Sequence, residues 1–152
     1  MKLKILVGTV TSTAEYVAQA IQMDCADLVD DIEIQLMDGL DITAFDDDAL
    51  FLICTSTYGA GDVPDNAQRL YDALDMTPKF LGHVRYGVIA LGDMGSHAAT
   101  FCAAGKRFDE RLQGLGARRV GEIWCHDASD GSVPEADGVA WCRDWLALAA
   151  AA

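Results

Sequence analysis

Short apolar runs, each closed by glycine or hydroxyl residues, set the pattern of this chain. Three of them lie at residues 2–7, 50–55 and 86–91. Runs of this length, bounded by turn residues, are typical of strands buried on both faces. Residues 32–36 instead alternate apolar and polar side chains, which favours an edge or half-buried strand. A last strand is predicted at residues 119–124.

Helical spacing occupies the intervals between these strands. Helices are predicted from residue 15 to about residue 23, after Asn66, from Phe101 to an end at Gly116, and near the end of the chain. The acidic residues 38–48 predict a connection with at most a short helix. The residues that we expect to face inward are Tyr16, Val17, Ala20, Ile21, Leu40, Ile42, Phe45, Leu70, Tyr71, Leu74, Phe101, Gly105, Phe108, Leu112, Leu115, Trp141, Trp145 and Leu148.

This alternation of strands and helices predicts an α/β fold with a parallel sheet covered on both faces. With five strands and right-handed crossovers, the expected architecture is a doubly wound three-layer sandwich in one domain, residues 1–152. Ligands of such folds bind beyond the carboxyl ends of the strands. Three loops leave those ends, at residues 8–13, 56–66 and 92–100, and we expect them to form one pocket.

The first of these loops is rich in hydroxyl groups and precedes a helix. Free backbone N–H groups, hydroxyls and the helix dipole together make an anion site. Residues 8–15 contain no Lys or Arg and match neither GxxxxGK[ST] nor GxGxxG. The loop therefore predicts a monophosphate held by hydrogen bonds, as in a mononucleotide cofactor. The alternative is a threonine-rich helix start that binds nothing.

Composition narrows the classes of partner. The chain is 51% hydrophobic and has no 18-residue apolar run or signal sequence, so we expect a folded, cytoplasmic protein. Its net charge of −13 disfavours nucleic acid and anionic membranes as partners. The same charge favours a basic protein partner that is met by electrostatic steering. The alternative is that the acidic residues only keep the protein soluble and do not attract a partner.

The cysteines show no spacing of a metal site or a disulfide framework. They are odd in number and scattered, without a CxxC motif, so buried thiols are expected and no metal is predicted. They are Cys25, Cys54, Cys102, Cys125 and Cys142.

The three loops together resemble those of a known family. GTVTSTAE at residues 8–15, STYGAGDVPDN at residues 56–66 and ALGD at residues 90–93, followed by TFCAAGKRFD at residues 100–109, are similar to the flavodoxins. The similarity is greatest to short-chain, MioC-type members and to the FMN domains of sulfite and cytochrome P450 reductases. The resemblance implies a sheet of order 2-1-3-4-5, non-covalently bound FMN, and single-electron transfer from a flavodoxin/ferredoxin-NADP reductase to an acceptor enzyme. It implies no catalytic acid, base or nucleophile, and we expect a monomer.

The resemblance also implies roles for individual residues. The first loop would hold the phosphate, Tyr58 would stack on the isoalloxazine, and the Gly59 carbonyl would turn toward flavin N5–H after reduction. Asp62, Asp65 and Asn66 would fix the second loop, with Asp65 or Asn66 capping the helix that follows. The residues expected to bind the cofactor are Thr9, Val10, Thr11, Ser12, Thr13, Ser56, Thr57, Tyr58, Gly59, Ala60, Gly61, Leu91, Gly92, Asp93, His97, Phe101 and Cys102.

Two departures from the family pattern lie in these loops. Ser12 stands where relatives have glycine, which removes the freedom to adopt a positive φ. The third loop is two residues longer than in relatives and lacks their second stacking aromatic residue. Ala98 or Ser96 occupies that position, depending on the alignment, and His97 or Met94 is a candidate to cover the flavin instead. A protonated His97 would add positive charge beside the reduced ring.

Two other functions remain open from the sequence. One is an NAD(P)H-dependent flavin or quinone reductase on the same fold, although no second nucleotide motif is visible. The other is an interaction module that keeps the fold without FMN. For a flavodoxin, the net charge of −13 disfavours a further negative charge on the flavin and predicts low-potential electron donation.

Overall fold

The computed structural model describes residues 1–9, 12–57, 61–92, 102–127 and 131–151. Strands and helices alternate along the chain, as the apolar runs and the helical spacing predict. The elements are β1 (Lys2–Gly8), α1 (Thr13–Asp24), β2 (Asp31–Leu36), the 3-10 helix η1 (Ile42–Phe45), β3 (Leu50–Ser56), α2 (Asp65–Met76), β4 (Arg85–Gly92), α4 (Ala103–Gly114), β5 (Arg118–Arg119), β6 (Trp124–Asp127) and α5 (Pro134–Ala151).

All strand pairs of the sheet are parallel, and their order is β2-β1-β3-β4-β5. The predicted order 2-1-3-4-5 is therefore confirmed. Strand β6 also pairs with β4, in parallel, so the fifth strand consists of two pieces beside the same neighbour.

The prediction of one continuous strand over residues 119–124 is wrong. The ladder continues to Val120, whose N–H donates to the Tyr86 carbonyl at 2.8 Å. It then breaks at Gly121, which has a φ of +71°. The Val120 carbonyl accepts a hydrogen bond from Trp145 Nε1 at 3.0 Å instead of joining the ladder. The sequence pattern of residues 119–124 does not reveal this change of partner.

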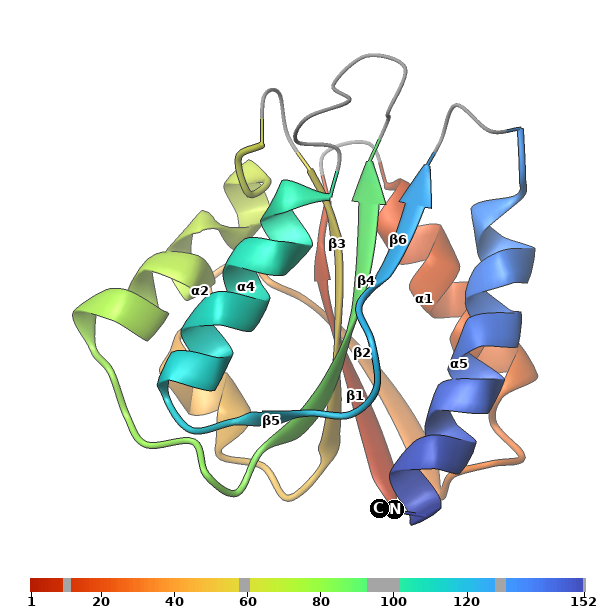
Figure 1. Ribbon diagram of the computed structural model, residues 1–152, viewed down its shortest axis with the longest axis horizontal. Helices are drawn as coiled ribbons and strands as arrows, with labels where there is room; N and C mark the ends of the chain where they lie inside the picture. Colours follow the sequence, from red (N-terminus) through yellow and green to blue (C-terminus); the bar gives the residue numbers. More distant parts are fainter. Residues whose placement is uncertain (10–11, 58–60, 93–101, 128–130, 152) are drawn as a thin grey trace.

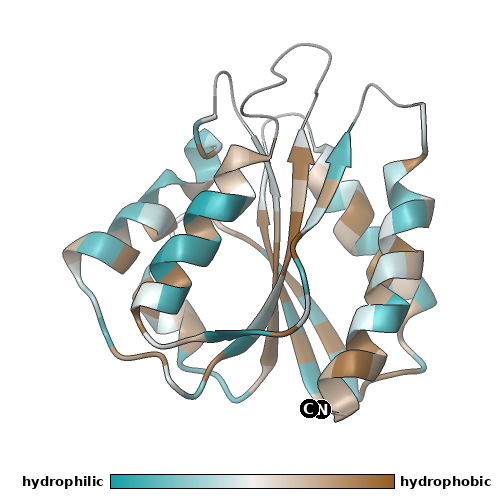
Figure 2. Cartoon of the chain, viewed as in Figure 1, coloured by the Kyte–Doolittle hydropathy of each residue, from teal (hydrophilic) through white to brown (hydrophobic). Residues whose placement is uncertain are grey.

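Helices cover both faces of the sheet, as Figure 1 shows: α1 and α5 lie on one side, and α2 and α4 lie on the other. Most residues along the central strands are apolar (Figure 2). In β1, Leu3, Ile5 and Val7 pack toward α1 and α5. Leu6 packs toward α2 and α4, while Lys4 on that face is only 6% exposed. The strict alternation of strand side chains thus divides the apolar runs between two cores.

Two glycines bring helices unusually close to β4. A Cβ on Gly87 would lie 2.4 Å from Trp145 Cε2 of α5, and a Cβ on Gly105 of α4 would lie 2.5 Å from Ala90 Cβ. Asp109 of α4 accepts a hydrogen bond from the buried Tyr86 hydroxyl at 2.6 Å. Both α4 and α5 are therefore docked firmly on the strand whose end opens the third loop.

The predicted inward side chains that the structure describes lie in or against the two cores except at three positions, and Phe101 lies outside the described residues. In α1 the buried residues are Ala14, Val17, Ala18 and Ile21. That stripe excludes Tyr16, which is 55% exposed, and leaves Ala20 only partly buried. In α5, Trp145 is 3% exposed but Leu148 is 49% exposed, because the buried stripe is rotated by about one residue from the predicted one. Helix α4 ends as predicted, with Gly116 at φ +95°.

Four cysteines are buried and Cys125 is partly buried, and all five are free. Across the described ranges, no helix is long and apolar enough to cross a bilayer. The same residues contain no cluster of three or more metal-ligating side chains.

Candidate functional site

The carboxyl ends of four strands meet at one edge of the sheet (Figure 1). In register, Gly8 of β1 pairs with Thr55 of β3. Ser56 pairs with Leu91 of β4, and Gly92 pairs with Asp127 of β6. The residues that open the three predicted loops therefore lie together at this edge, which we call the loop edge.

Close packing fixes the end of β1. A Cβ on Gly8 would lie 2.8 Å from Thr55 Oγ1 and 3.1 Å from Ala67 Cβ of α2. No larger residue fits there without displacing β3 or α2. The loop that follows β1 thus starts from a rigid position.

Ser12 has a φ of +67° and a ψ of 1°, the left-handed conformation that favours glycine. It is the N-cap residue of α1, and its side chain makes no capping hydrogen bond. The departure from the family's glycine therefore falls on a position that requires a positive φ. Thr13 begins the helix directly after it.

Asn66 connects three segments at the loop edge. Its Oδ1 accepts a hydrogen bond from the Thr9 N–H at 2.8 Å. Its Nδ2 donates to the Val7 carbonyl and to Asp38 Oδ2, each at 3.3 Å. The amide group of α2 thereby sets where the first loop leaves β1.

The prediction that Asp65 or Asn66 caps α2 is wrong. Both residues lie inside the helix, and Pro64 is its N-cap without a side-chain hydrogen bond. The Asn near the helix start does form a hydrogen bond with a backbone N–H, but that N–H belongs to Thr9 in the first loop and not to α2. No local pattern identifies a partner 57 residues away.

Two buried hydroxyls at the loop edge lack a partner. Thr9 Oγ1 and Ser56 Oγ are buried and have no hydrogen-bond partner among the described residues. An unsatisfied buried polar group costs about 1–3 kcal/mol, so such groups in native proteins call for an explanation. Both residues were predicted to bind the cofactor, and a ligand with polar groups would supply the missing partners.

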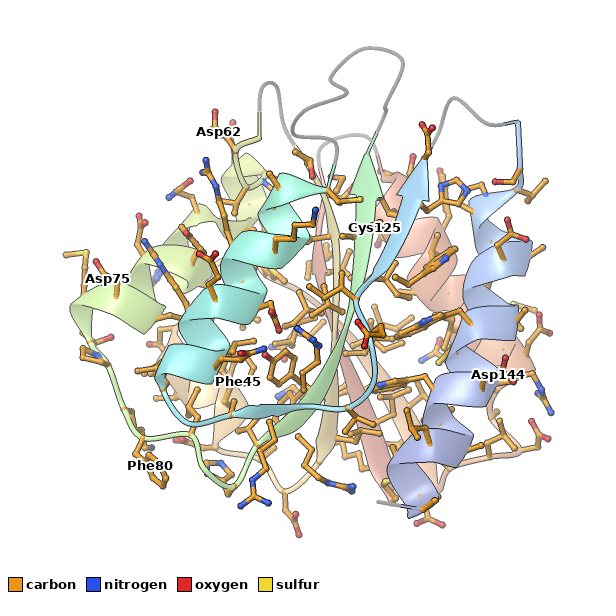
Figure 3. The ribbon with its side chains drawn as sticks, in the orientation of Figure 1. Phe45, Asp62, Asp75, Phe80, Cys125 and Asp144 are labelled. Atoms are coloured by element: carbon orange, nitrogen blue, oxygen red, sulfur yellow. The ribbon has the colours of Figure 1, made fainter. Side chains whose placement is uncertain are left out.

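The second loop is tied to α4 at both described ends. Thr57 Oγ1 accepts a hydrogen bond from the Ala104 N–H at 3.4 Å. After the loop, Gly61 has a φ of +116°, and Asp62 pairs with Arg107 of α4 at 3.6 Å. Asp62, labelled in Figure 3, lies at the same end of the molecule as the loop edge. The expectation that Asp62 helps to fix this loop agrees with that ion pair.

Two predicted site residues belong to the core through their side chains. Leu91 is 4% exposed and packs with the α1 and α5 side. Cys102 is 1% exposed, and its thiol donates to the Ala90 carbonyl at 3.4 Å. At both positions, only backbone groups remain for a ligand at the loop edge.

The other predicted site residues lie outside the described residues. They are Val10, Thr11, Tyr58, Gly59, Ala60, Asp93, His97 and Phe101, together with the alternatives Met94, Ser96 and Ala98.

The buried thiol nearest the first loop is a poor nucleophile. Burial raises the pKa of Cys54 to about 12, and its thiol donates to the Ala14 carbonyl at 3.4 Å. A thiol in this environment stays protonated and behaves as a core side chain. Cys54 is therefore not a candidate nucleophile. The groups that the loop edge offers to a ligand are hydroxyls and backbone groups, which suit an anion.

Comparisons with known proteins show which family this chain is similar to. A family model described as Flavodoxin matches residues 5–141. Flavodoxin YqcA of Escherichia coli K12 is 43% identical over 101 residues, 66% of each chain. The uncharacterized protein PA3435 of Pseudomonas aeruginosa is 39% identical over 151 residues, 97% of each chain. A solved cysteine-to-serine mutant of a flavodoxin from Pseudomonas aeruginosa superposes with a TM-score of 0.82 at 34% identity, covering 97% of this chain and 98% of that one.

Proposed function

Because this chain belongs to the flavodoxin family, whose members bind FMN and transfer electrons, we propose that it is a single-domain electron carrier. In this proposal it takes single electrons from a reductase and passes them to redox enzymes. The observation that carries the proposal is the pair of buried, unpartnered hydroxyls, Thr9 Oγ1 and Ser56 Oγ. They lie at the loop edge, where we propose that the cofactor binds, and a phosphorylated flavin would offer the partners that they lack.

The first loop would hold the FMN phosphate without a cation. Thr9 would present its hydroxyl and Asn66 would fix its backbone through the 2.8 Å hydrogen bond, while the start of α1 would contribute its dipole. Ser56, Thr57 and the second and third loops would surround the flavin ring, with Tyr58 and His97 as the proposed covering side chains. When bound, FMN supplies the one-electron chemistry; the chain's residues bind it, orient it and exclude water.

The proposed partners are basic proteins. Three exposed carboxylates, Asp38, Asp62 and Asp65, lie on the segments that adjoin the loop edge, and the whole chain carries a net charge of −13. Such a field speeds association with a positively charged partner, and salt weakens the effect. A flavodoxin/ferredoxin-NADP reductase and a cytoplasmic acceptor enzyme fit this chemistry, with the carrier acting as a monomer.

The proposal is tested on the purified protein in two steps. The visible spectrum and a titration of the apoprotein with FMN report cofactor binding, and the proposal requires a two-band yellow spectrum with uptake of one FMN per chain. Steady-state oxidation of NADPH is then measured with and without an added reductase. A carrier oxidises NADPH only with the reductase present, and the rate of reduction falls as salt is added. Steady NADPH oxidation by the protein alone would instead identify a flavin or quinone reductase, and colourless protein without uptake would identify an interaction module.

A further inference from the structure

Two thiols from distant parts of the chain meet beside Ala90 of β4. Cys102, at the N-cap of α4, donates its thiol to the Ala90 carbonyl at 3.4 Å. Cys125 of β6 is the register partner of Ala90. The two thiols are close enough to influence each other's protonation. Figure 3 labels Cys125 near the start of α4.

The packing of α4 brings this pair together. Gly105 has no Cβ, and a Cβ there would lie 2.5 Å from Ala90 Cβ, so the first turn of α4 sits directly on β4. Register partners on neighbouring parallel strands point to the same face of a sheet. Cys125 therefore shares the α4 face with Ala90 and packs against the same core cluster as Cys102.

The two cysteines differ in solvent exposure and in the pKa of their thiols. Cys102 is 1% exposed, whereas Cys125 is partly exposed. The neighbouring Cys102 thiol lowers the pKa of Cys125, and the positive charge of Lys106 adds to this lowering against the effect of burial. The neighbouring Cys125 thiol and burial raise the pKa of Cys102. The exposed thiol of the pair is thus the one that loses its proton more easily, and the thiolate is the nucleophilic form.

We propose that Cys102 and Cys125 form a redox-active dithiol that hydroperoxides convert into an intramolecular disulfide. The Cys125 thiolate attacks hydrogen peroxide and, with one proton, gives a sulfenic acid and water. The Cys102 sulfur then attacks the Cys125 sulfur and displaces a second water as the S–S bond forms. In total, two thiols lose two hydrogen atoms and two electrons, and one hydrogen peroxide becomes two waters.

A second cysteine pair provides a matched comparison within the same chain. Cys25 and Cys142 are also close enough to influence each other's protonation, but both have an exposed fraction of 0%. Burial raises the pKa of both thiols. Both pairs are therefore neighbouring thiols, whereas access and acidity distinguish Cys125. The Cys25–Cys142 pair is expected to stay reduced under the same treatment.

The experiment exposes the protein, as purified, to hydrogen peroxide, blocks the remaining thiols with N-ethylmaleimide and maps peptides by mass spectrometry without reduction. We expect a Cys102–Cys125 disulfide, with Cys125 losing its free thiol at least about tenfold faster than Cys25 and Cys142. Dithiothreitol must restore both thiols. This readout does not involve FMN, so it stands whether or not the proposed electron-carrier role is correct.

Three variants assign the steps. Cys102→Ser should stop at a sulfenic acid on Cys125 that dimedone traps, and Cys125→Ser should leave Cys102 reduced. Cys142→Ser, the control, should form the Cys102–Cys125 disulfide at the wild-type rate. The proposal is overturned if wild-type protein forms a Cys25–Cys142 disulfide first. It is also overturned if oxidation of Cys125 yields only disulfides between two molecules, or if no disulfide containing Cys102 forms.

Discussion

Among the described residues, Ser12 is the non-glycine residue with a positive φ, at +67°, and it lies near the end of the proposed phosphate loop, directly before α1. The left-handed conformation costs an L-residue about 1–2 kcal/mol. A glycine would relieve that cost but would lose about 0.5–1 kcal/mol through the greater flexibility of the unfolded chain. Ser12 therefore strains the backbone at the site. The difference between the cost of this strain and the cost of a flexible glycine can be measured as a change in the free energy of unfolding.

We predict that Ser12→Gly raises the free energy of unfolding of the apoprotein by about 0.5–1 kcal/mol. Urea denaturation followed by circular dichroism measures this value. Ser12→Ala, the control, retains the left-handed strain and should give no gain. A glycine variant that is no more stable than the wild type would show that Ser12 is not strained.

Asn66 is the second informative residue, because its side chain, on α2, accepts a hydrogen bond from the Thr9 N–H and so fixes the start of the first loop. We predict that Asn66→Ala lowers the free energy of unfolding by about 1 kcal/mol and raises the FMN dissociation constant about tenfold. Fluorescence titration of the apoprotein with FMN measures the second effect. Gln68→Ala, on the same helix, is the control: the Gln68 side chain donates to Asp72, and its loss should leave FMN binding unchanged. Equal dissociation constants in the two variants would contradict the role of Asn66.

At the scale of elements, close glycine contacts determine how the helices dock. Trp145 of α5 lies over Gly87 of β4, and its Nε1 donates to the Val120 carbonyl at 3.0 Å. This single side chain thus joins α5, β4 and the break between β5 and β6. The contact requires the absence of a Cβ at Gly87, where one would lie 2.4 Å from the indole ring.

We predict that Gly87→Ala lowers the free energy of unfolding by about 1–3 kcal/mol, because the indole must move and the core is overpacked. Urea denaturation followed by far-ultraviolet circular dichroism gives the value. Gly114→Ala is the matched control: a Cβ on Gly114 meets nothing within 4 Å, and alanine there should raise stability by about 0.5–1 kcal/mol. Opposite signs for the two variants are expected, and a neutral Gly87→Ala would disprove the packing argument.

The sequence predicts elements better than it predicts their interruptions. Apolar runs reveal β1, β3 and β4, because burial on both faces favours apolar side chains at successive positions, although Lys2 and Lys4 interrupt the run in β1. The break at Gly121 depends on Trp145, which lies on another element, and a one-dimensional pattern cannot show such a partner. In the candidate site, the types and positions of Thr9 and Ser56 are enough to predict them as ligands, whereas the contact between Asn66 and Thr9 depends on tertiary packing.

At the scale of the whole molecule, the response to acid follows from how the many carboxylates are paired. The Lys4 ammonium, 6% exposed, lies 2.8 Å from Asp47 Oδ2. It holds the pKa of Asp47 below the ordinary value of 3.8. A carboxyl group whose folded-state pKa is lowered stabilises the fold at pH values above its unfolded pKa. That contribution is lost as the pH falls through the folded-state value.

We predict that Asp47→Asn lowers the urea midpoint at pH 7, and that the difference from wild type shrinks as the pH falls below about 4. Urea denaturation at a series of pH values measures both midpoints. Asp46→Asn is the control, because Asp46 pairs with the half-exposed Lys79 and such surface pairs contribute little. A difference that is constant from pH 7 to about pH 2 would contradict the assignment to the Asp47 charge.

The most direct test of the account concerns the two unpartnered hydroxyls at the loop edge. Thr9→Val and Ser56→Ala remove Thr9 Oγ1 and Ser56 Oγ with little change in shape, and Thr43→Val removes a hydroxyl from η1, which bonds to Asp41. FMN is titrated into each apoprotein, and the unfolding of each apoprotein is measured beside it. We predict that Thr9→Val and Ser56→Ala each weaken FMN binding about tenfold while the apoproteins are as stable as wild type or more so. Thr43→Val should leave FMN binding unchanged. Wild-type FMN affinity in both loop-edge variants would contradict the claim that these hydroxyls hold the cofactor.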